Sequence, residues 1–378
     1  MKKVLLMTAI AAVCSHSVLA EVNISGFASV MGGKLTSGTG VPEFGLGPTF
    51  LANYPIVGVY EDEWTFKPDS KFGLQMTADL AEGLTATAQL VGRGADDFDA
   101  GFEWAYLSYT LNDHWTIQAG KKRLPLYYYS DFFDVSYAYL WIRPAADNYT
   151  WQIFNYNGVN AQFNYQLSDW TVSGNIYTGR EDDTENKLLS EFFGTDPVRE
   201  IWKDIIGGVV SLNRDWFDFR LTYMTYVNER FINEDGVDVQ QTWNGSPERR
   251  GKFAGISVNI DYNNLVLLSE LNQLDLDGDK FDTYMVSLGY RFNTVTPYIS
   301  YADFDSDGEV HNTTSIGFRY DFHNSAAFKL QYDDVEDKGF DGLHIGRHGD
   351  NALGQGFDAD EFGRTIRLAA GGLNNGLS

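Results

Sequence analysis

Residues 158–179 read GVNAQFNYQLSDWTVSGNIYTG, and this stretch decides the fold. Its first ten residues alternate polar and apolar side chains, the apolar ones being Val159, Ala161, Phe163, Tyr165 and Leu167. A period of two residues is typical of a β-strand with one apolar and one polar face. Ser168-Asp169 interrupts the pattern, and a second run of ten residues follows. The stretch therefore predicts two antiparallel strands joined by a tight turn.

The same pattern recurs along the whole chain. Sixteen such runs are predicted to be strands: residues 22–33, 71–80, 84–93, 102–111, 115–121, 158–167, 170–179, 205–213, 216–227, 252–262, 265–274, 281–292, 295–304, 313–322, 326–334 and 363–370. Tight turns follow every second strand, at residues 81–83, 112–114, 168–169, 213–215, 263–264, 293–294 and 323–325. Longer, acidic loops make the other connections. An even number of strands with short turns on one side and long loops on the other is typical of an outer-membrane barrel. The sequence thus predicts an all-β fold, a transmembrane antiparallel β-barrel of about 16 strands.

Strand length and the position of aromatic residues agree with a membrane-spanning barrel. Ten residues tilted by about 45° rise roughly 23 Å, which is close to the apolar band of such barrels. Aromatic residues gather near the tight turns, as in an interfacial girdle: Trp115, Trp170, Phe217, Tyr262, Tyr290, Phe292, Tyr320 and Phe322. A soluble β-sandwich has no reason to ring one edge with aromatics. A barrel this wide leaves an aqueous channel, which the polar strand faces would line.

The N-terminus and the overall charge narrow the class further. Residues 1–20 combine Lys2 and Lys3, an apolar run and the small-residue site Val18-Leu19-Ala20, so they predict a secretory signal peptide. Residues 21–378 are then a single barrel domain, with no cysteine after Cys14. No later run of 18 apolar residues suggests a membrane helix. The formal net charge of −24 argues against nucleic acid as a partner, because an acidic chain repels phosphate.

Residues 121–157 interrupt the strand pattern with KKRLPLYYYSDFFDVSYAYLWIRPAADNYTWQIFNYN. A structureless connection of this length is uncommon and usually functional or disordered. Disorder is disfavoured because disordered segments contain few aromatic residues. A surface loop with its own small core is one interpretation. Inside a wide barrel, the same mixture of aromatic and charged residues favours a third long loop that folds into the lumen and narrows it.

The chain resembles the Gram-negative general-diffusion porins, which are sixteen-stranded trimers. The resemblance rests on GFASV at residues 26–30, AGKKRLP at 119–125, YSDFFD at 129–134 and PYISY at 297–301. It implies passive diffusion through a constriction at which loop carboxylates face a basic cluster on the wall across water. Charged candidates for this constriction are Lys122, Arg123, Asp131, Asp134, Arg143 and Asp147. Lys71, Arg93 and Arg220 are lumen-wall candidates by the direction they face, although for Lys71 and Arg220 an ordinary solvated residue of the lumen is the favoured interpretation.

The resemblance also implies a location and partners. These are the outer membrane of a Gram-negative bacterium, contact with its lipid and lipopolysaccharide, a homotrimer, and small hydrophilic solutes and ions as cargo. The short second loop, residues 94–101, offers little for the latch that joins subunits in this family. Family members usually close their last strand with an aromatic residue, which the predicted strand at 363–370 lacks. Acidic long loops, for example residues 181–185 and 303–309, predict that cations are preferred.

The sequence supports other functions less strongly. A channel selective for a sugar, phosphate or organic acid is the main alternative, because Tyr127, Tyr128, Tyr129 and Trp141 could stack on a sugar ring. For a barrel enzyme the sequence offers neither a G-x-S-x-G nucleophile motif nor a phosphate-binding loop, so no catalytic residue is predicted.

Two acidic spacings and one histidine pair resemble metal sites but lack key ligands. Asp303, Asp305, Asp307 and Gly308 match the start of a calcium-binding loop, but Thr314 stands where calcium needs a glutamate. Asp275, Asp277 and Asp279, and likewise His344 and His348, give no better site, so we predict no metal or cofactor. Residues 185–202 predict two short helices.

Overall fold

Antiparallel strands form one continuous sheet in the computed structural model, which describes residues 21–38, 48–193, 197–234, 236–306, 309–340 and 364–374. The sheet has seventeen strands, of which β12 (Val237–Gln240) is a short addition to β11, so sixteen make the wall. The wall strands are β1 (Val22–Ser37), β4 (Lys71–Ala81), β5 (Leu84–Arg93), β6 (Ala100–Asn112), β7 (Trp115–Arg123), β8 (Asn155–Leu167), β9 (Trp170–Asp183), β10 (Val198–Arg214), β11 (Phe217–Glu234), β13 (Arg249–Tyr262), β14 (Leu265–Leu276), β15 (Asp279–Tyr290), β16 (Val295–Ser306), β17 (Glu309–His323), β18 (Ala326–Phe340) and β19 (Arg364–Asn374).

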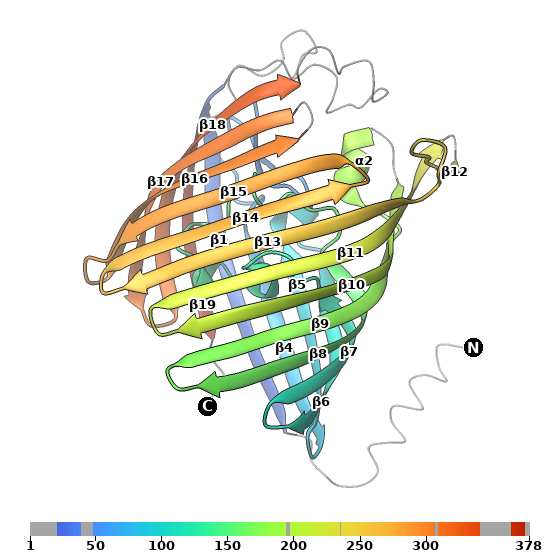
Figure 1. Cartoon of the computed structure of the whole chain (residues 1–378). Helices are drawn as coiled ribbons and strands as arrows, with labels where there is room; N and C mark the ends of the chain where they lie inside the picture. The colour runs from blue at the N-terminus through green and yellow to red at the C-terminus, as the bar shows by residue number, and fades with distance from the viewer. Residues whose placement is uncertain are drawn as a thin grey trace.

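The sheet closes on itself. Each wall strand pairs with the next one in the chain, and β19 pairs with β18 on one side and β1 on the other, while β1 also pairs with β4. Figure 1 shows the resulting barrel with its strands strongly tilted. All sixteen predicted strands are confirmed, including the last, which forms its ladders without a terminal aromatic.

The predictions from sequence failed only for short elements outside the sixteen wall strands. The hairpin β2 (Phe50–Asn53) and β3 (Gly58–Tyr60) and the strand β12 were not predicted. Of the two helices predicted within residues 185–202, α2 (Lys187–Phe193) forms but the second is wrong, because β10 starts at Val198. Its backbone hydrogen-bonds to β9 and β11 along this stretch, and pairing on both edges outweighs the local helix signal.

The tight turns use residues that tolerate a left-handed backbone. Gly83, Asn263 and Asn293 have φ values of 71°, 56° and 56°. Glycine and asparagine adopt this conformation more readily than other residues. Each turn therefore reverses the chain at low energetic cost between two strands of matched length.

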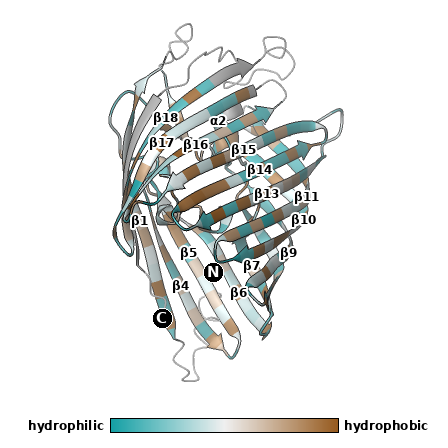
Figure 2. Cartoon of the chain, turned by 60° about the vertical axis from the view of Figure 1, so that its left-hand side comes forward, coloured by the Kyte–Doolittle hydropathy of each residue, from teal (hydrophilic) through white to brown (hydrophobic). Residues whose placement is uncertain are grey.

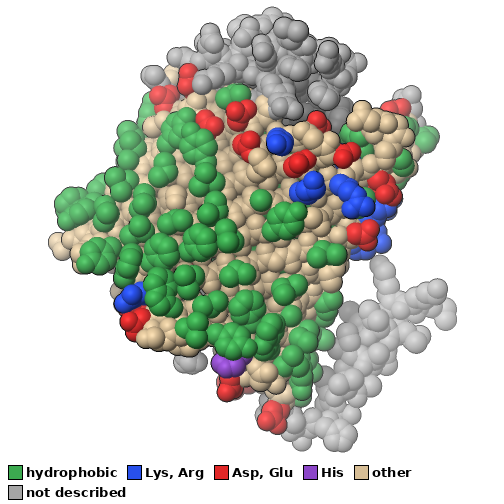
Figure 3. Space-filling model, in the orientation of Figure 1, with side chains coloured by type: hydrophobic (Ala, Val, Ile, Leu, Met, Phe, Trp, Pro, Cys, Tyr) green, Lys and Arg blue, Asp and Glu red, His purple; other side chains and the backbone are tan. Residues whose placement is uncertain are grey.

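The two faces of the wall differ as the alternation predicts. On β15, Leu288 and Tyr290 face outward and are 47% and 44% exposed. Ser287 of the same strand faces inward and is 1% exposed. Figure 2 shows apolar and polar residues alternating along the strands, and Figure 3 shows apolar side chains spread over the outer surface. No helix in the described part of the chain is long and apolar enough to span a membrane.

The main apolar core lies inside the barrel. Residues 124–154, which connect β7 to β8 and are called the inner loop from here on, run through the lumen and include η3 (Ser130–Phe132) and η4 (Ser136–Ala138). The loop packs with inward side chains of the wall, among them Trp202, Tyr226 and Phe253, in one buried cluster. The prediction that this stretch folds into the lumen is thereby confirmed.

Candidate functional site

The inner loop is fixed to one side of the wall by Asp134. Its carboxylate accepts two hydrogen bonds from Arg93, at 3.0 and 2.7 Å, and one from Arg123 at 2.9 Å. Lys71 Nζ lies 3.5 Å away. The side chain of Asp134 is only 3% exposed, so the expectation that it faces its cations across water is wrong. A carboxylate buried this deeply is stable only when direct ion pairs replace its water shell.

Glu103 is a second carboxylate in this cluster, and the sequence did not indicate it. It accepts from Arg93 at 2.6 Å and from Arg123 at 2.5 Å. The pairing of β5 with β6 shifts register next to Glu103, between Trp104 and Phe102. This bulge turns Glu103 inward although strict alternation would place it outside, which is why the pattern alone could not find it.

Charge and aromatic contacts hold this group together. Lys71 and Arg123 lie over the ring of Phe133, at 5.3 and 5.8 Å from its centroid. Burial by itself would raise the pKa of Asp134, but the charges of Arg93, Arg123 and Lys71 outweigh it and hold that pKa well below its ordinary value. Asp134 is therefore ionised at all physiological pH values. We call Lys71, Arg93, Glu103, Arg123 and Asp134 the seat cluster.

Asp131 differs from Asp134 in being exposed. Its charge acts on Lys122, which is partly buried, hydrogen-bonds Gln118 and lies 4.3 Å from the ring centroid of Tyr106. Among the described residues, no ion pair within 4.0 Å involves Asp131. Asp131 and Lys122 thus carry opposite charges without direct contact, and their role at the constriction stays a prediction.

The opposite wall binds the first part of the inner loop. Arg220 donates to the carbonyl oxygens of Pro125 at 2.7 Å and Tyr128 at 3.4 Å. Glu270 accepts from the Tyr128 backbone N–H and from the Tyr149 hydroxyl, both at 2.9 Å. Arg220 is 9% exposed and Lys71 only 3%, so neither is an ordinary solvated residue of the lumen.

A third set of contacts holds the middle of the loop. Arg319 of β17 donates to the carbonyls of Tyr137 and Tyr139, at 2.6 and 2.7 Å. Lys329 of β18 donates to the carbonyl of Ser136 at 2.6 Å and to that of Trp141. Neither cation was predicted as a site residue, although each lies within a predicted strand and Arg319 alternates with apolar residues. The strand positions of the two cations could be read from the sequence, but no sequence feature indicated that the inner loop reaches β17 and β18 across the lumen.

Arg143 and Asp147 also help to hold the inner loop in place. Arg143 Nε lies 3.3 Å from Asp69 Oδ1, and Asp147 lies 2.7 Å from Nδ1 of His311. Both loop side chains are 2% exposed as whole residues. The structure therefore places Arg143 against Asp69, in the connection that precedes β4, and Asp147 against His311 of β17.

Above the seat cluster, on the side of the long loops, lies an outer vestibule with a cavity volume of about 330 Å³. Arg93, Arg123 and Phe133 form part of its lining. The lining is of mixed charge: Lys121 and Lys187 are also basic, and the acidic residues are Asp96, Glu103, Glu181, Asp183 and Glu185. Within the described ranges, no three His, Cys, Asp or Glu side chains are grouped so that they could hold a metal ion. Asp307, Gly308, His344 and His348 lie outside the described residues.

Comparison with known proteins gives a consistent picture. The family model described as Gram-negative porin matches residues 7–351. The chain is similar to the outer membrane channel DcaP of Acinetobacter baumannii, with a TM-score of 0.58 and 10% identity over 94% of this chain and 97% of that one. It is similar to Salmonella typhi OmpF in complex with daunomycin, with a TM-score of 0.56 and 13% identity over 94% and 98%. An anion-selective porin from Comamonas acidovorans gives a TM-score of 0.52 and 12% identity over 94% and 100%. At these identities the structures establish the fold alone, and no curated protein sequence matches the chain.

Proposed function

The chain belongs to the Gram-negative porin family, a family of diffusion channels in the outer membrane, and we propose that it passes small hydrophilic solutes and ions with a preference for cations. The observation that carries the preference is the contrast between lumen charges. Arg93 and Arg123 are paired with buried carboxylates, whereas Asp131 is exposed and in no direct ion pair within the described residues. An ion in the lumen thus meets negative charge first.

The outer vestibule supports the same preference. Its lining carries five acidic side chains and four basic ones, so its acidic excess is small. Together with the acidic long loops, this excess supports the accumulation of cations before they reach Asp131. We further propose that residues 1–20 are removed as a signal peptide and that residues 21–378 form one membrane domain. We propose a homotrimer as well, because a solved porin-like neighbour, OmpT of Vibrio cholerae, is described in a trimer form. A channel, and not an enzyme, is the function we propose.

A channel selective for sugars is less well supported. Tyr127, Tyr129 and Trp141 are 4%, 5% and 2% exposed, so three of the four aromatics that could stack on a sugar ring are buried in the core of the loop. Only Tyr128 is partly exposed. The loop aromatics therefore support packing rather than a stacking platform.

Planar-bilayer recordings of the purified protein test the proposal. We expect stepwise, ohmic conductance and a cation-sign reversal potential in a KCl gradient. Since the screening length falls from about 10 Å at 0.1 M salt to about 3 Å at 1 M, the reversal potential should shrink as both solutions are raised in concentration. Asp131→Asn should reduce it severalfold at low salt with little change in conductance. Anion preference at low salt would refute the proposed selectivity, and saturable block by a single solute would favour a substrate-selective channel.

A further inference from the structure

The outer vestibule combines charges of both signs, and part of that charge is already used inside the protein. Lys187 of α2 forms an ion pair with Asp96 of η2 (Gly94–Asp96). Arg93 is bound to two carboxylates, those of Glu103 and Asp134, at 2.6 and 2.7 Å. These three pairs hold the loops and the seat cluster together. The charges left for a solute are therefore those of the other lining residues.

Three carboxylates of the lining remain without a cation. Within the described ranges, no Lys, Arg or His nitrogen lies within 4.0 Å of Glu181, Asp183 or Glu185. Glu181 accepts a hydrogen bond from the amide of Asn157 at 2.7 Å, and Asp183 accepts one from the amide of Asn186 at 2.8 Å. Because these donors are neutral, they orient the carboxylates and leave their charge in place. The end of β9 thus presents negative charge to the vestibule.

Two basic side chains of the lining are free to bind an anionic group. Lys121 is in no ion pair among the described residues, although its charge acts on two of these carboxylates. Arg123 is 5% exposed, and its hydrogen bonds in the described part of the chain all come from Nη2, at 2.5 and 2.9 Å. Its guanidinium lies 5.8 Å from the ring centroids of Phe133 and Phe154, which also line the vestibule. Nη1 and Nε of Arg123 thus remain available to a further acceptor.

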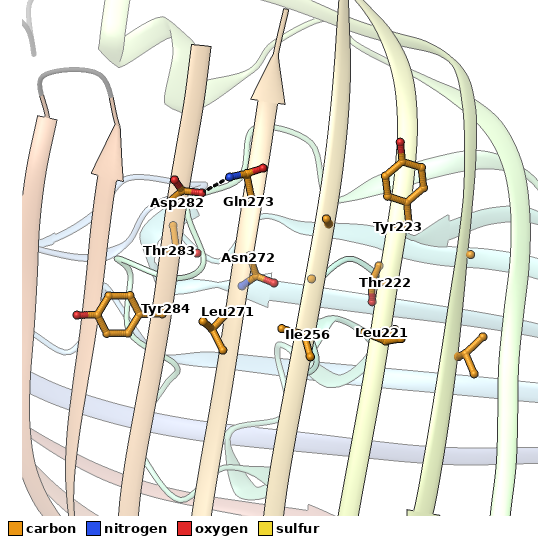
Figure 4. A pocket seen from close by; sticks show the side chains of 14 residues that line it. Leu221, Thr222, Tyr223, Ile256, Leu271, Asn272, Gln273, Asp282, Thr283 and Tyr284 are labelled. Atoms are coloured by element: carbon orange, nitrogen blue, oxygen red, sulfur yellow. Dashed lines mark hydrogen bonds between the residues drawn. The ribbon is translucent and has the colours of Figure 1, made fainter. Parts of the chain in front are cut away.

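A second, larger hollow lacks this combination. It has a cavity volume of about 720 Å³ and lies on the outer surface of the wall over β10 to β15. Figure 4 shows the side chains that line it. Among the described residues of its lining, Asp282 alone is charged, and it accepts a hydrogen bond from Gln273 at 2.7 Å. Charges of both signs are therefore a feature of the vestibule and not of every hollow in this barrel.

We propose that the outer vestibule binds basic amino acids and short basic peptides. Lys121 and Arg123 bind the carboxylate of the solute, and the carboxylates at the end of β9 bind its ammonium or guanidinium groups. Charges of opposite sign on the two partners give such a site its specificity. A volume of about 330 Å³ lies at the small end of the range for ligand cavities, about 300–1,000 Å³. The inference rests on the proposed function, because it names a class of solute that the cation-preferring pore takes.

Arginine and agmatine distinguish this site from a general attraction of cations. Agmatine is arginine without the carboxylate, so its net positive charge is larger. A vestibule that only attracts cations binds agmatine more tightly. The proposed site binds arginine more tightly, by at least about tenfold, which is the effect of one charge-assisted contact. Isothermal titration calorimetry of the detergent-solubilised protein at low salt measures both dissociation constants, with lysine and cadaverine as a second pair that should behave in the same way.

Lys121→Gln tests the binding of the carboxylate without disturbing the seat cluster. The variant should lose most of the preference for arginine over agmatine and should not weaken the binding of agmatine. Lys67→Gln is the matched control, because Lys67 is an exposed cation that pairs with Asp97 and does not line the vestibule. This control should keep the preference of the wild-type protein.

Glu181→Gln/Asp183→Asn tests the other half of the site. The double variant should weaken arginine and agmatine alike, each by about tenfold or more, since both solutes lose a charge-assisted contact. Glu61→Gln/Asp62→Asn removes two exposed carboxylates that are not in the lining, and it should leave the binding of both solutes unchanged.

Agmatine that bound to the wild-type protein as tightly as arginine would overturn the proposal without any variant. Equal effects of Lys121→Gln and Lys67→Gln on the preference would overturn it as well. The pore is tested separately by conductance and reversal potential in KCl, which involve no amino acid. A pore that conducts and prefers cations but shows no preference for arginine would refute this site alone. Tight arginine binding by a protein that does not conduct would refute the proposed pore and leave the site.

Discussion

Replacing Asp134 by asparagine is the most direct test of how the inner loop is held. Asparagine has nearly the same shape as aspartate, so the substitution removes a charge without opening a cavity. In the seat cluster, Lys71, Arg93 and Arg123 carry three positive charges against the two negative charges of Glu103 and Asp134. The variant leaves three cations with Glu103 alone, so the net charge of the cluster rises from +1 to +2.

The size of the effect follows from burial. Lys71 and Arg123 are 3% and 4% exposed as side chains, so water cannot replace the lost carboxylate. Removing one partner of a buried ion pair destabilises a protein by about 3–5 kcal/mol. We expect the lower end, about 3 kcal/mol, because Glu103 still neutralises Arg93 and Arg123 in part. The loop should detach locally before the wall unfolds, since no strand pairing is changed.

Urea unfolding of the detergent-folded barrel, followed by tryptophan fluorescence, measures the loss, and single-channel recordings report loop motion as added current noise. Asp131→Asn is the matched control: it removes the same charge three residues away, at an exposed position. It should shift selectivity but not stability. If Asp134→Asn lost no more stability than Asp131→Asn, or left the current as quiet as in the wild-type protein, the seat cluster would not be what holds the loop.

Three further outcomes follow from the same contacts. Lys329→Met should lower stability by about 1–3 kcal/mol, because it removes the buried ammonium that donates to the carbonyls of Ser136 and Trp141, and it should raise conductance; an unchanged urea midpoint would contradict this. Trp141→Ala should lose about 3–5 kcal/mol by opening a cavity, whereas Trp141→Phe should lose only the hydrogen bond to Ser287, about 1 kcal/mol, and similar losses would contradict a packed core. Because the pKa of Asp134 is lowered on folding, its stabilisation is present above the unfolded pKa of about 3.9 and is lost as pH falls through the lower folded value. The stability difference between wild type and Asp134→Asn should therefore be constant between about pH 5 and 8 and narrow only in strong acid, and a difference that changed near neutral pH would contradict the assignment.

The wall could be predicted from the sequence because each strand carries its own signal. Residues 84–93 were predicted and observed with the same bounds, and the predicted turn at Ser168-Asp169 lies between β8 and β9. Period, length and turn residues are local properties, and they agree with the global fold. The observed strands mostly run further toward the long loops, as β11 does to Glu234, because pairing with a neighbour continues where the alternation fades.

The site was predictable only in part, because its contacts join residues far apart in the chain. Motif resemblance identified Asp131, Asp134 and Arg123, but it could not show that Asp134 is buried and Asp131 exposed. That difference depends on where the loop backbone runs. Glu103 faces inward only because of a bulge, and Lys329 matters only because the inner loop crosses the lumen to β18. Neither fact is encoded in the spacing of nearby residues.

The contacts of the lumen cations are the basis of the proposed preference for cations in a constriction that contains many basic side chains. Lys71, Arg93, Arg123, Arg220, Arg319 and Lys329 all contact either buried carboxylates or loop carbonyls. Glu103 and Asp134 balance most of the charge of Lys71, Arg93 and Arg123 at short range, while Arg220, Arg319 and Lys329 donate to loop carbonyls. Asp131 has no such partner among the described residues, and its charge acts on Lys122 without an ion pair. A count of charges near the constriction would therefore predict a preference for anions, while the arrangement of those charges supports the proposed preference for cations.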